Sequence, residues 1–85
     1  MKEFRYTIQD EQGIHARPAG LLVKEASKFS SNITIACNEK IGDAKRIFSV
    51  MALGAKCGTE IILKAEGVDE EESINALSRF LKENL

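Results

Sequence analysis

The spacing of apolar residues changes repeatedly along this chain, and these changes constrain the fold more than any other feature. Over residues 3–8, apolar and polar side chains alternate, which is the pattern of a half-buried strand. The same alternation returns over residues 33–37 and 60–65, and a short strand is expected at residues 40–43 after a polar turn. Each predicted strand therefore has a single apolar face that must be covered.

Three other segments have apolar residues at helical spacing. The first runs from Ala16 to near residues 29–32, the second covers residues 46–53 and stops at Gly54 as a left-handed C-cap, and the third follows Asp69. We expect Asp69 to cap the third helix, with Glu72 completing a capping box. The stripes expected to face a core are Ala19, Leu22, Val23 and Ala26 in the first helix and Ile74, Leu77 and Leu81 in the third.

The predicted element order is βαββαβα, and 85 residues leave room for a single domain, residues 1–85. Strands with one apolar face and helices with apolar stripes pack naturally as an α+β structure of two layers. We therefore expect a four-stranded antiparallel sheet covered on one face by three helices. The opposite face, which carries Arg5, Thr7, Thr34 and Lys64, is expected to meet water.

The charge balance and apolar run lengths exclude several classes of function. Twelve basic and 13 acidic residues leave a net charge of −1, which provides no general attraction to nucleic acid. No apolar run approaches a membrane span, and the first residues do not resemble a signal peptide, so a cytoplasmic location without membrane insertion is expected. Cys37 and Cys57 lack metal-ligand spacing and are expected to be free thiols, with a single disulfide as the alternative.

The only histidine, His15, lies where the first helix is expected to begin. Pro18 is tolerated in a first helical turn, and the free backbone N–H groups of that turn attract anions. Arg17 adds a fixed positive charge, so the segment suits a phosphoryl group carried on the imidazole. The alternative is a histidine that merely caps the helix or lies at the surface.

The second predicted helix has too many apolar positions to bury all of them against one sheet. On a helical wheel, Ile47, Phe48 and Met51 fall on one arc, while Val50 and Leu53 fall on another. We interpret the first arc as exposed, and exposed apolar patches often mark partner surfaces. The alternative is that loops cover it or that the helix lies deeper.

Other chemistries find less support in the sequence. Neither a metal site nor a Cys–His hydrolase has the required spacing around His15, and Cys37 fits a small inward-facing core residue. No glycine-rich nucleotide motif is present. A small metal-dependent or thiol-dependent enzyme is kept as an alternative of a different class.

The run Gly13–Ala19, with sequence GIHARPA, resembles the phosphorylation motif of HPr, the histidine-containing phosphocarrier of the bacterial sugar phosphotransferase system. The motif is highly specific, and the resemblance extends over essentially the whole chain. Further segments that carry the resemblance are Lys24–Phe29, Ala44–Lys45, Val50–Gly54 and Ala65–Gly67.

The resemblance implies an open-faced β-sandwich and a phosphocarrier that is not an enzyme and needs no cofactor. It implies that His15 accepts a phosphoryl group at Nδ1 from Enzyme I, that Arg17 interacts with the phosphate, and that the A domains of sugar-specific Enzymes II are the acceptors. We expect a monomer. The docking residues implied by the resemblance are Ala16, Gly20, Leu21, Ile47, Phe48 and Met51. The alternative within this family is a regulatory paralogue that acts as a phosphorylation-dependent binding module.

Two positions depart from the pattern of the family. Where some members carry a regulatory serine that an ATP-dependent kinase phosphorylates, this chain has Arg46, and Ser49 points elsewhere on the helix. We therefore expect no regulation by that kinase. Glu39 stands where many members have glycine in a tight turn, so we expect another type of turn there.

Overall fold

The computed structural model describes residues 1–85 and has the predicted element order. The four strands form one sheet in the order β1-β4-β2-β3, and every neighbouring pair is antiparallel. The α+β prediction with seven elements is thus confirmed. The elements are β1 (Lys2–Thr7), α1 (Ala16–Ala26), β2 (Asn32–Cys37), β3 (Lys40–Asp43), α2 (Ile47–Met51), β4 (Glu60–Glu66) and α3 (Glu70–Asn84).

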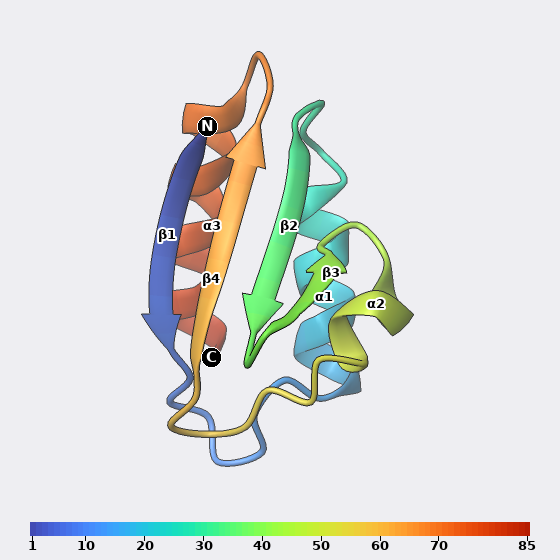
Figure 1. The fold of residues 1–85 in the computed structure, drawn as a ribbon, viewed down its shortest axis with the longest axis vertical. Coiled ribbons are helices and arrows are strands. Elements are labelled where there is room, and N and C mark those ends of the chain that lie inside the picture. The colour runs from blue at the N-terminus through green and yellow to red at the C-terminus, as the bar shows by residue number, and fades with distance from the viewer.

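The two long helices lie on one side of the sheet, and the other side is open (Figure 1). Helix α3 lies behind β1 and β4, α1 packs beside it and stands behind β3, and the short α2 lies at the β3 edge next to α1. The loops after β1 and before β4 meet at the lower end of the molecule, where α1 begins and the chain ends. This end therefore gathers segments that are far apart in the sequence.

The core follows from the alternation within the strands. In the central pair, Ile35 of β2 lies opposite Leu63 of β4, and both side chains are fully buried under the helices. Removing one such side chain from water contributes about 1.5–3 kcal/mol. Leu22 of α1 and Leu77 of α3 cover them from the helical layer, and one cluster of 19 buried apolar residues results.

The outward face of the sheet is only partly as open as predicted. Arg5 and Thr7 on the edge strand β1 are exposed, whereas Thr34 and Lys64 are half-buried. The latter two are register partners on the central strands β2 and β4. Neighbouring side chains on both sides shield them, which an edge strand does not provide.

Helix α1 ends at Ala26, earlier than the predicted end near residues 29–32. The next two residues continue in tight turns, in which Lys28 N donates to Glu25 O and Phe29 N donates to Ala26 O. Helix α2 spans Ile47–Met51 and is shorter than the predicted 46–53. Gly54 adopts the predicted left-handed conformation, with φ +62°, and its N–H donates to Met51 O, but the C-cap of the helix is Ala52, so the prediction that Gly54 caps it is wrong.

The predicted capping box at the start of α3 is wrong. Asp69 occupies the capping position but makes no capping hydrogen bond with its side chain, and Glu72 is exposed. Instead, the Asp69 carboxylate accepts hydrogen bonds from the backbone N–H groups of Ser30 and Ser31 and from the Ser31 hydroxyl. Three donors that converge on one carboxylate compete successfully with a single helix N–H.

The turn between β2 and β3 also corrects an expectation. Cys37 pairs with Lys40, so only Asn38 and Glu39 remain to form the loop. Their φ angles are +48° and +70°, and positive φ at both central residues is the signature of a type I′ turn. The expectation of another turn type because of Glu39 is therefore wrong: the strand register leaves a loop of two residues, and Glu39 adopts the positive φ that the type I′ form of such a loop requires.

Candidate functional site

His15 lies immediately before α1, with an extended backbone at φ −108° and ψ −177°. Its carbonyl oxygen accepts the first helical hydrogen bond, from Ala19 N at 2.9 Å. Its side chain makes no capping hydrogen bond and is partly exposed. The imidazole is therefore available for chemistry instead of being used to cap the helix.

The loop before His15 is held by contacts with the loop that precedes β4. Gly13 adopts φ +68°, its N–H donates to Asp10 O at 2.9 Å, and Ile14 N donates to Ala55 O at 3.0 Å. A side chain at Gly13 would approach Lys56 Cα to 2.8 Å, so only glycine fits this crossing. The backbone that carries the imidazole is thus fixed on both sides.

The first turn of α1 is electropositive. The N–H groups of Ala16 and Arg17 have no acceptor within the helix, and Pro18 contributes no N–H at all. No acidic residue lies in this turn, and the Arg17 side chain is exposed. The helix dipole adds to this positive potential. The turn can therefore bind the oxygens of a phosphoryl group.

A shallow hollow of about 260 Å³ adjoins His15. It brings together His15, Arg17, Pro18 and Leu21, which sequence reasoning selected, and adds two residues that it missed: Asp10 and Asn84. Asp10 Oδ2 lies 4.0 Å from His15 Nε2. Asn84 stands at the end of α3, and no local pattern in the sequence indicates that it reaches this site.

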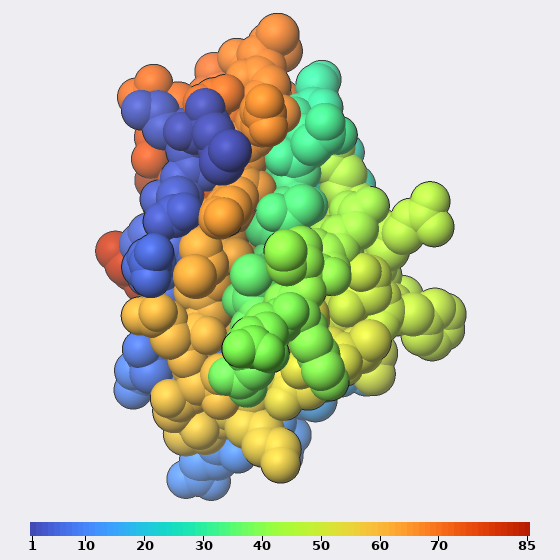
Figure 2. All heavy atoms as spheres, viewed as in Figure 1, coloured from blue at the N-terminus to red at the C-terminus, as the bar shows by residue number.

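The predicted exposed arc on α2 is present at Phe48 and Met51, which are 83% and 38% exposed. Leu21 of α1 is 44% exposed, and Val50 is buried. The segment around α2 extends furthest from the body of the molecule in the space-filling view (Figure 2). An apolar surface formed by Leu21, Phe48 and Met51 therefore lies beside the start of α1.

Ile47 differs from this expectation because it is half-buried and packs against the core. Its Cδ1 atom would lie 3.7 Å from a Cβ placed on Gly20. An added Cβ at Gly20 would make only an ordinary van der Waals contact with Ile47, so the approach of α2 to α1 does not require glycine there. Ala16 is exposed and Gly20 is half-buried beside this contact.

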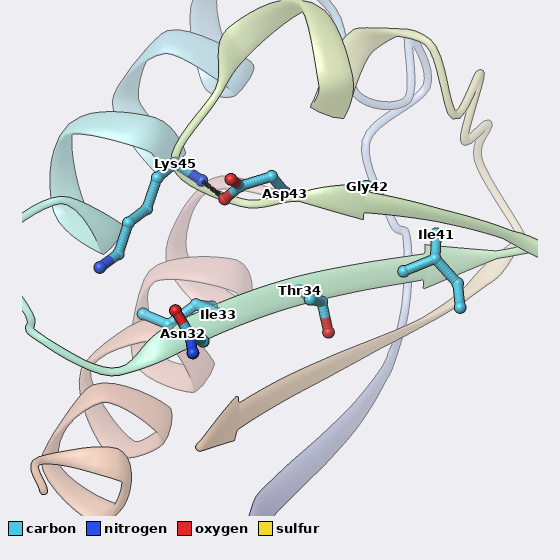
Figure 3. Close-up of a pocket in the computed structure, with 7 residues that line it drawn as sticks. All are labelled: Asn32, Ile33, Thr34, Ile41, Gly42, Asp43 and Lys45. Carbon is cyan, nitrogen blue, oxygen red and sulfur yellow. Dashed lines mark hydrogen bonds between the residues drawn. The ribbon is translucent and has the colours of Figure 1, made fainter. Parts of the chain in front are cut away.

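Other parts of the molecule offer less chemistry. Cys37 is buried, Cys57 is exposed, and no group of three histidine, cysteine or acidic side chains is placed to hold a metal ion. A hollow of about 370 Å³ between β2 and β3 has Asp43 and Lys45 as its charged residues, and Lys45 N donates to the Asp43 carboxylate at 2.9 Å (Figure 3). None of the helices has the length and apolarity that crossing a bilayer requires.

The two carboxyl groups with displaced pKa values belong to Asp69 and Glu70 at the start of α3, which lies at the opposite end of the molecule from the start of α1 (Figure 1). The Ser31 hydroxyl and then the Ser30 N–H lower the pKa of Asp69. The N-terminal amino group and then the Gly67 N–H lower the pKa of Glu70. These groups therefore bear on stability, and the electrostatics of the His15 region come from Arg17, Asp10 and the helix start.

Comparisons with known proteins agree with this geometry. Residues 2–83 match the family model described as the PTS HPr component phosphorylation site. The phosphocarrier protein HPr of Mycoplasma capricolum is 53% identical over 81 residues, which cover 95% of this chain and 91% of that protein.

Two solved structures show the same fold. A mycoplasma histidine-containing phosphocarrier protein superposes with a TM-score of 0.94 at 50% identity, covering 96% of this chain and 93% of that one. An HPr dimer from Thermoanaerobacter tengcongensis gives a TM-score of 0.78 at 46% identity, with 98% and 95% covered.

Proposed function

This chain belongs to the HPr family, the phosphocarriers of the sugar phosphotransferase system, and we propose that His15 is the residue on which it carries the phosphoryl group. A phosphocarrier of this family is not an enzyme but a carrier protein: it is phosphorylated on histidine by one protein and passes the phosphoryl group to another. One observation carries the assignment to His15. The only imidazole of the chain stands, without a capping role, beside free helix N–H groups and Arg17.

The transfer follows from the chemistry of these groups. The Nδ1 lone pair of His15 attacks phosphorus, and the bond from phosphorus to the donor breaks as the new N–P bond forms. Arg17 and the N–H groups of Ala16 and Arg17 then bind the phosphoryl oxygens. The family implies Enzyme I and Enzymes II as partners, and we propose Enzyme I as the donor and the Enzyme II A domains as acceptors.

We propose that both partners dock on the apolar surface beside His15. Leu21, Phe48 and Met51 are its exposed apolar side chains, and Ile47 supports them from below. Ala16 and Gly20 lie between this surface and the imidazole on the helix α1, so contact with them follows from docking there. The flexible side chain of Met51 suits a surface that must accept several different partners.

Labelling tests the assignment. Incubation with phosphoenolpyruvate and Enzyme I is expected to place an acid-labile phosphate on the wild-type chain and none on His15→Ala. Onward transfer to a sugar-specific Enzyme II A domain then distinguishes sugar transport from a purely regulatory paralogue. Wild-type protein that takes no label from a competent Enzyme I contradicts the proposal.

We also propose that the site for serine phosphorylation is absent. Arg46 occupies that position at the start of α2, where its Nε lies 3.7 Å from the Asp43 carboxylate. The nearest hydroxyl, that of Ser49, is half-buried and accepts a hydrogen bond from Asp43 N at 2.8 Å. A kinase would have to disrupt this contact to reach it.

Residues 1–85 are proposed to act as one domain and as a monomer in the cytoplasm. The single core cluster supports one domain, and the apolar surface beside His15 must stay uncovered for partners to dock. Light scattering after size exclusion measures the molecular mass in solution and so tests whether the chain is a monomer. A relative that forms a dimer provides the comparison.

A further inference from the structure

We propose that Asp10 is a positioning residue that holds the Nε2–H tautomer of His15 and so leaves the Nδ1 lone pair free to accept the phosphoryl group; this inference rests on the role proposed for His15. Asp10 Oδ2 lies 4.0 Å from His15 Nε2, and both side chains line the hollow beside Arg17. Asp10 is the only acidic residue found within ion-pair distance of the ring.

The carboxylate is anchored by contacts that do not involve the histidine. Asp10 Oδ1 accepts a hydrogen bond from Gln12 N at 2.8 Å, and Asp10 N donates to Leu85 O at 2.8 Å. Asp10 O accepts from Gly13 N at 2.9 Å. Both the side chain and the backbone of Asp10 are therefore fixed, and Oδ2 is the oxygen left for the imidazole.

The distance of 4.0 Å is longer than a hydrogen bond but lies within the range of a direct electrostatic contact between the carboxylate and Nε2. The contact decides which nitrogen is the nucleophile, because the partner of one ring nitrogen sets where the proton sits. A carboxylate attracts a ring nitrogen that bears a proton, and it repels the lone pair of an unprotonated ring nitrogen. Asp10 therefore favours the proton on Nε2 and the lone pair on Nδ1.

The same contact stabilises the carrier state. When the Nδ1 lone pair forms the N–P bond, the P–N bond of the donor breaks and its electron pair returns to the donor. The ring then bears a phosphoryl group on Nδ1 and a proton on Nε2, so it is an imidazolium whose charge the Asp10 carboxylate offsets. In the onward step the N–P electron pair returns to Nδ1, and the ring keeps its Nε2 proton throughout.

The position of the carboxylate fits this role. It lies at Nε2, across the ring from Nδ1, so it does not compete with the phosphoryl oxygens for the N–H groups of α1. Arg17 lines the same hollow and supplies the opposite charge for the phosphoryl group. The site thus keeps two negative groups apart: the Asp10 carboxylate lies near Nε2, and the phosphoryl group is bonded to Nδ1.

Nitrogen NMR on protein labelled with ¹⁵N in histidine tests the proposal, at a pH where the ring is neutral. Asp10→Asn keeps an acceptor for Gln12 N but presents an NH₂ group to Nε2, so the population is expected to shift toward the Nδ1–H tautomer. Asp10→Ser also removes the carboxylate, but it puts a hydroxyl there instead of an amide. Glu11→Gln is the matched control, because it removes one charge from an exposed neighbour without touching the ring.

Transfer from phosphorylated Enzyme I is expected to fall about tenfold in Asp10→Asn, the scale of one hydrogen bond to a charged group, and to stay unchanged in Glu11→Gln. The amide signals of Gln12 and Gly13 report whether the turn is intact. An unchanged tautomer in both Asp10 variants overturns the proposal, whatever happens to transfer. If wild-type His15 takes no phosphoryl group, the proposed function fails, and the tautomer measurement still decides the role of Asp10.

Discussion

The Asp69 carboxylate binds the backbone N–H of Ser31 at 2.9 Å, across 38 positions of the chain, instead of capping the helix that it precedes. It also accepts the Ser30 N–H and the Ser31 hydroxyl. The contact ties the loop after α1 to the start of α3. Gly67 belongs to the same junction, because a Cβ there would approach Ser31 Cα to 2.8 Å.

Asp69→Ala is expected to lower the midpoint of urea unfolding, because Ser30 and Ser31 lose the acceptor for their N–H groups. Glu72→Ala is the matched control, since this acidic residue lies in the same helical turn, is exposed and makes no such contact. Equal midpoints for the two variants would contradict a structural role for Asp69.

The Asp69 carboxylate also makes the stability of the folded state depend on pH. The pKa of Asp69 is lowered from 3.8 in the folded state, so the folded form binds fewer protons than the unfolded form and is favoured above that value. Stability is therefore expected to be lost as the pH falls below 3.8 and through the lowered pKa. Urea midpoints measured at neutral and acidic pH should converge for wild type and Asp69→Asn as the pH falls.

Arg17→Ala is expected to slow phosphoryl transfer by about 10–100-fold, the scale of a lost charge-assisted hydrogen bond. The unfolding midpoint should not change, because the Arg17 side chain is exposed and makes no ion pair in the structure. Rapid-quench transfer from Enzyme I gives the rate. Arg79→Ala, an exposed arginine outside the hollow, should transfer at the wild-type rate.

Phe48→Ala is expected to weaken Enzyme I binding by about tenfold while changing stability by less than about 0.5 kcal/mol. The side chain is 83% exposed, so its removal leaves no cavity. Leu53→Ala, close by in sequence but buried, should show the reverse pattern and lose about 2–5 kcal/mol. Calorimetric titration and urea unfolding measure the two effects, and normal Enzyme I affinity in Phe48→Ala would rule out this docking surface.

Treatment with ATP and HPr kinase is expected to produce no phosphoserine within residues 45–50 of the wild-type chain. Arg46→Ser is the positive control and should become a substrate, because it places an exposed hydroxyl at the start of α2. Peptide mass spectrometry locates the phosphate. Phosphate on wild-type Ser49 would show that its contact with Asp43 N opens readily.

The periodicity of apolar residues was enough to predict the elements and the two-layer arrangement, because burial of one face is a local pattern. It also placed His15 and Arg17 at one helix start and Leu21 off the apolar stripe of that helix, whereas the docking role of Leu21 came from the family resemblance. Element ends were less accurate. The loop after Ala26 and the capping of α3 depend on Asp69, whose partners lie far away in the sequence.

The sequence by itself thus determined the order of strands and helices, the motif around His15 and the apolar character of α2. Only the tertiary structure decided which of these groups meet. The fold carries Asn84 and Asp10 to His15 and packs Ile47 beside Gly20. Glu39 adopts a positive φ in the two-residue turn between β2 and β3. The placement of Asn84 beside His15 and of Ile47 beside Gly20 arises from packing between segments distant in the chain, and a local pattern does not encode it.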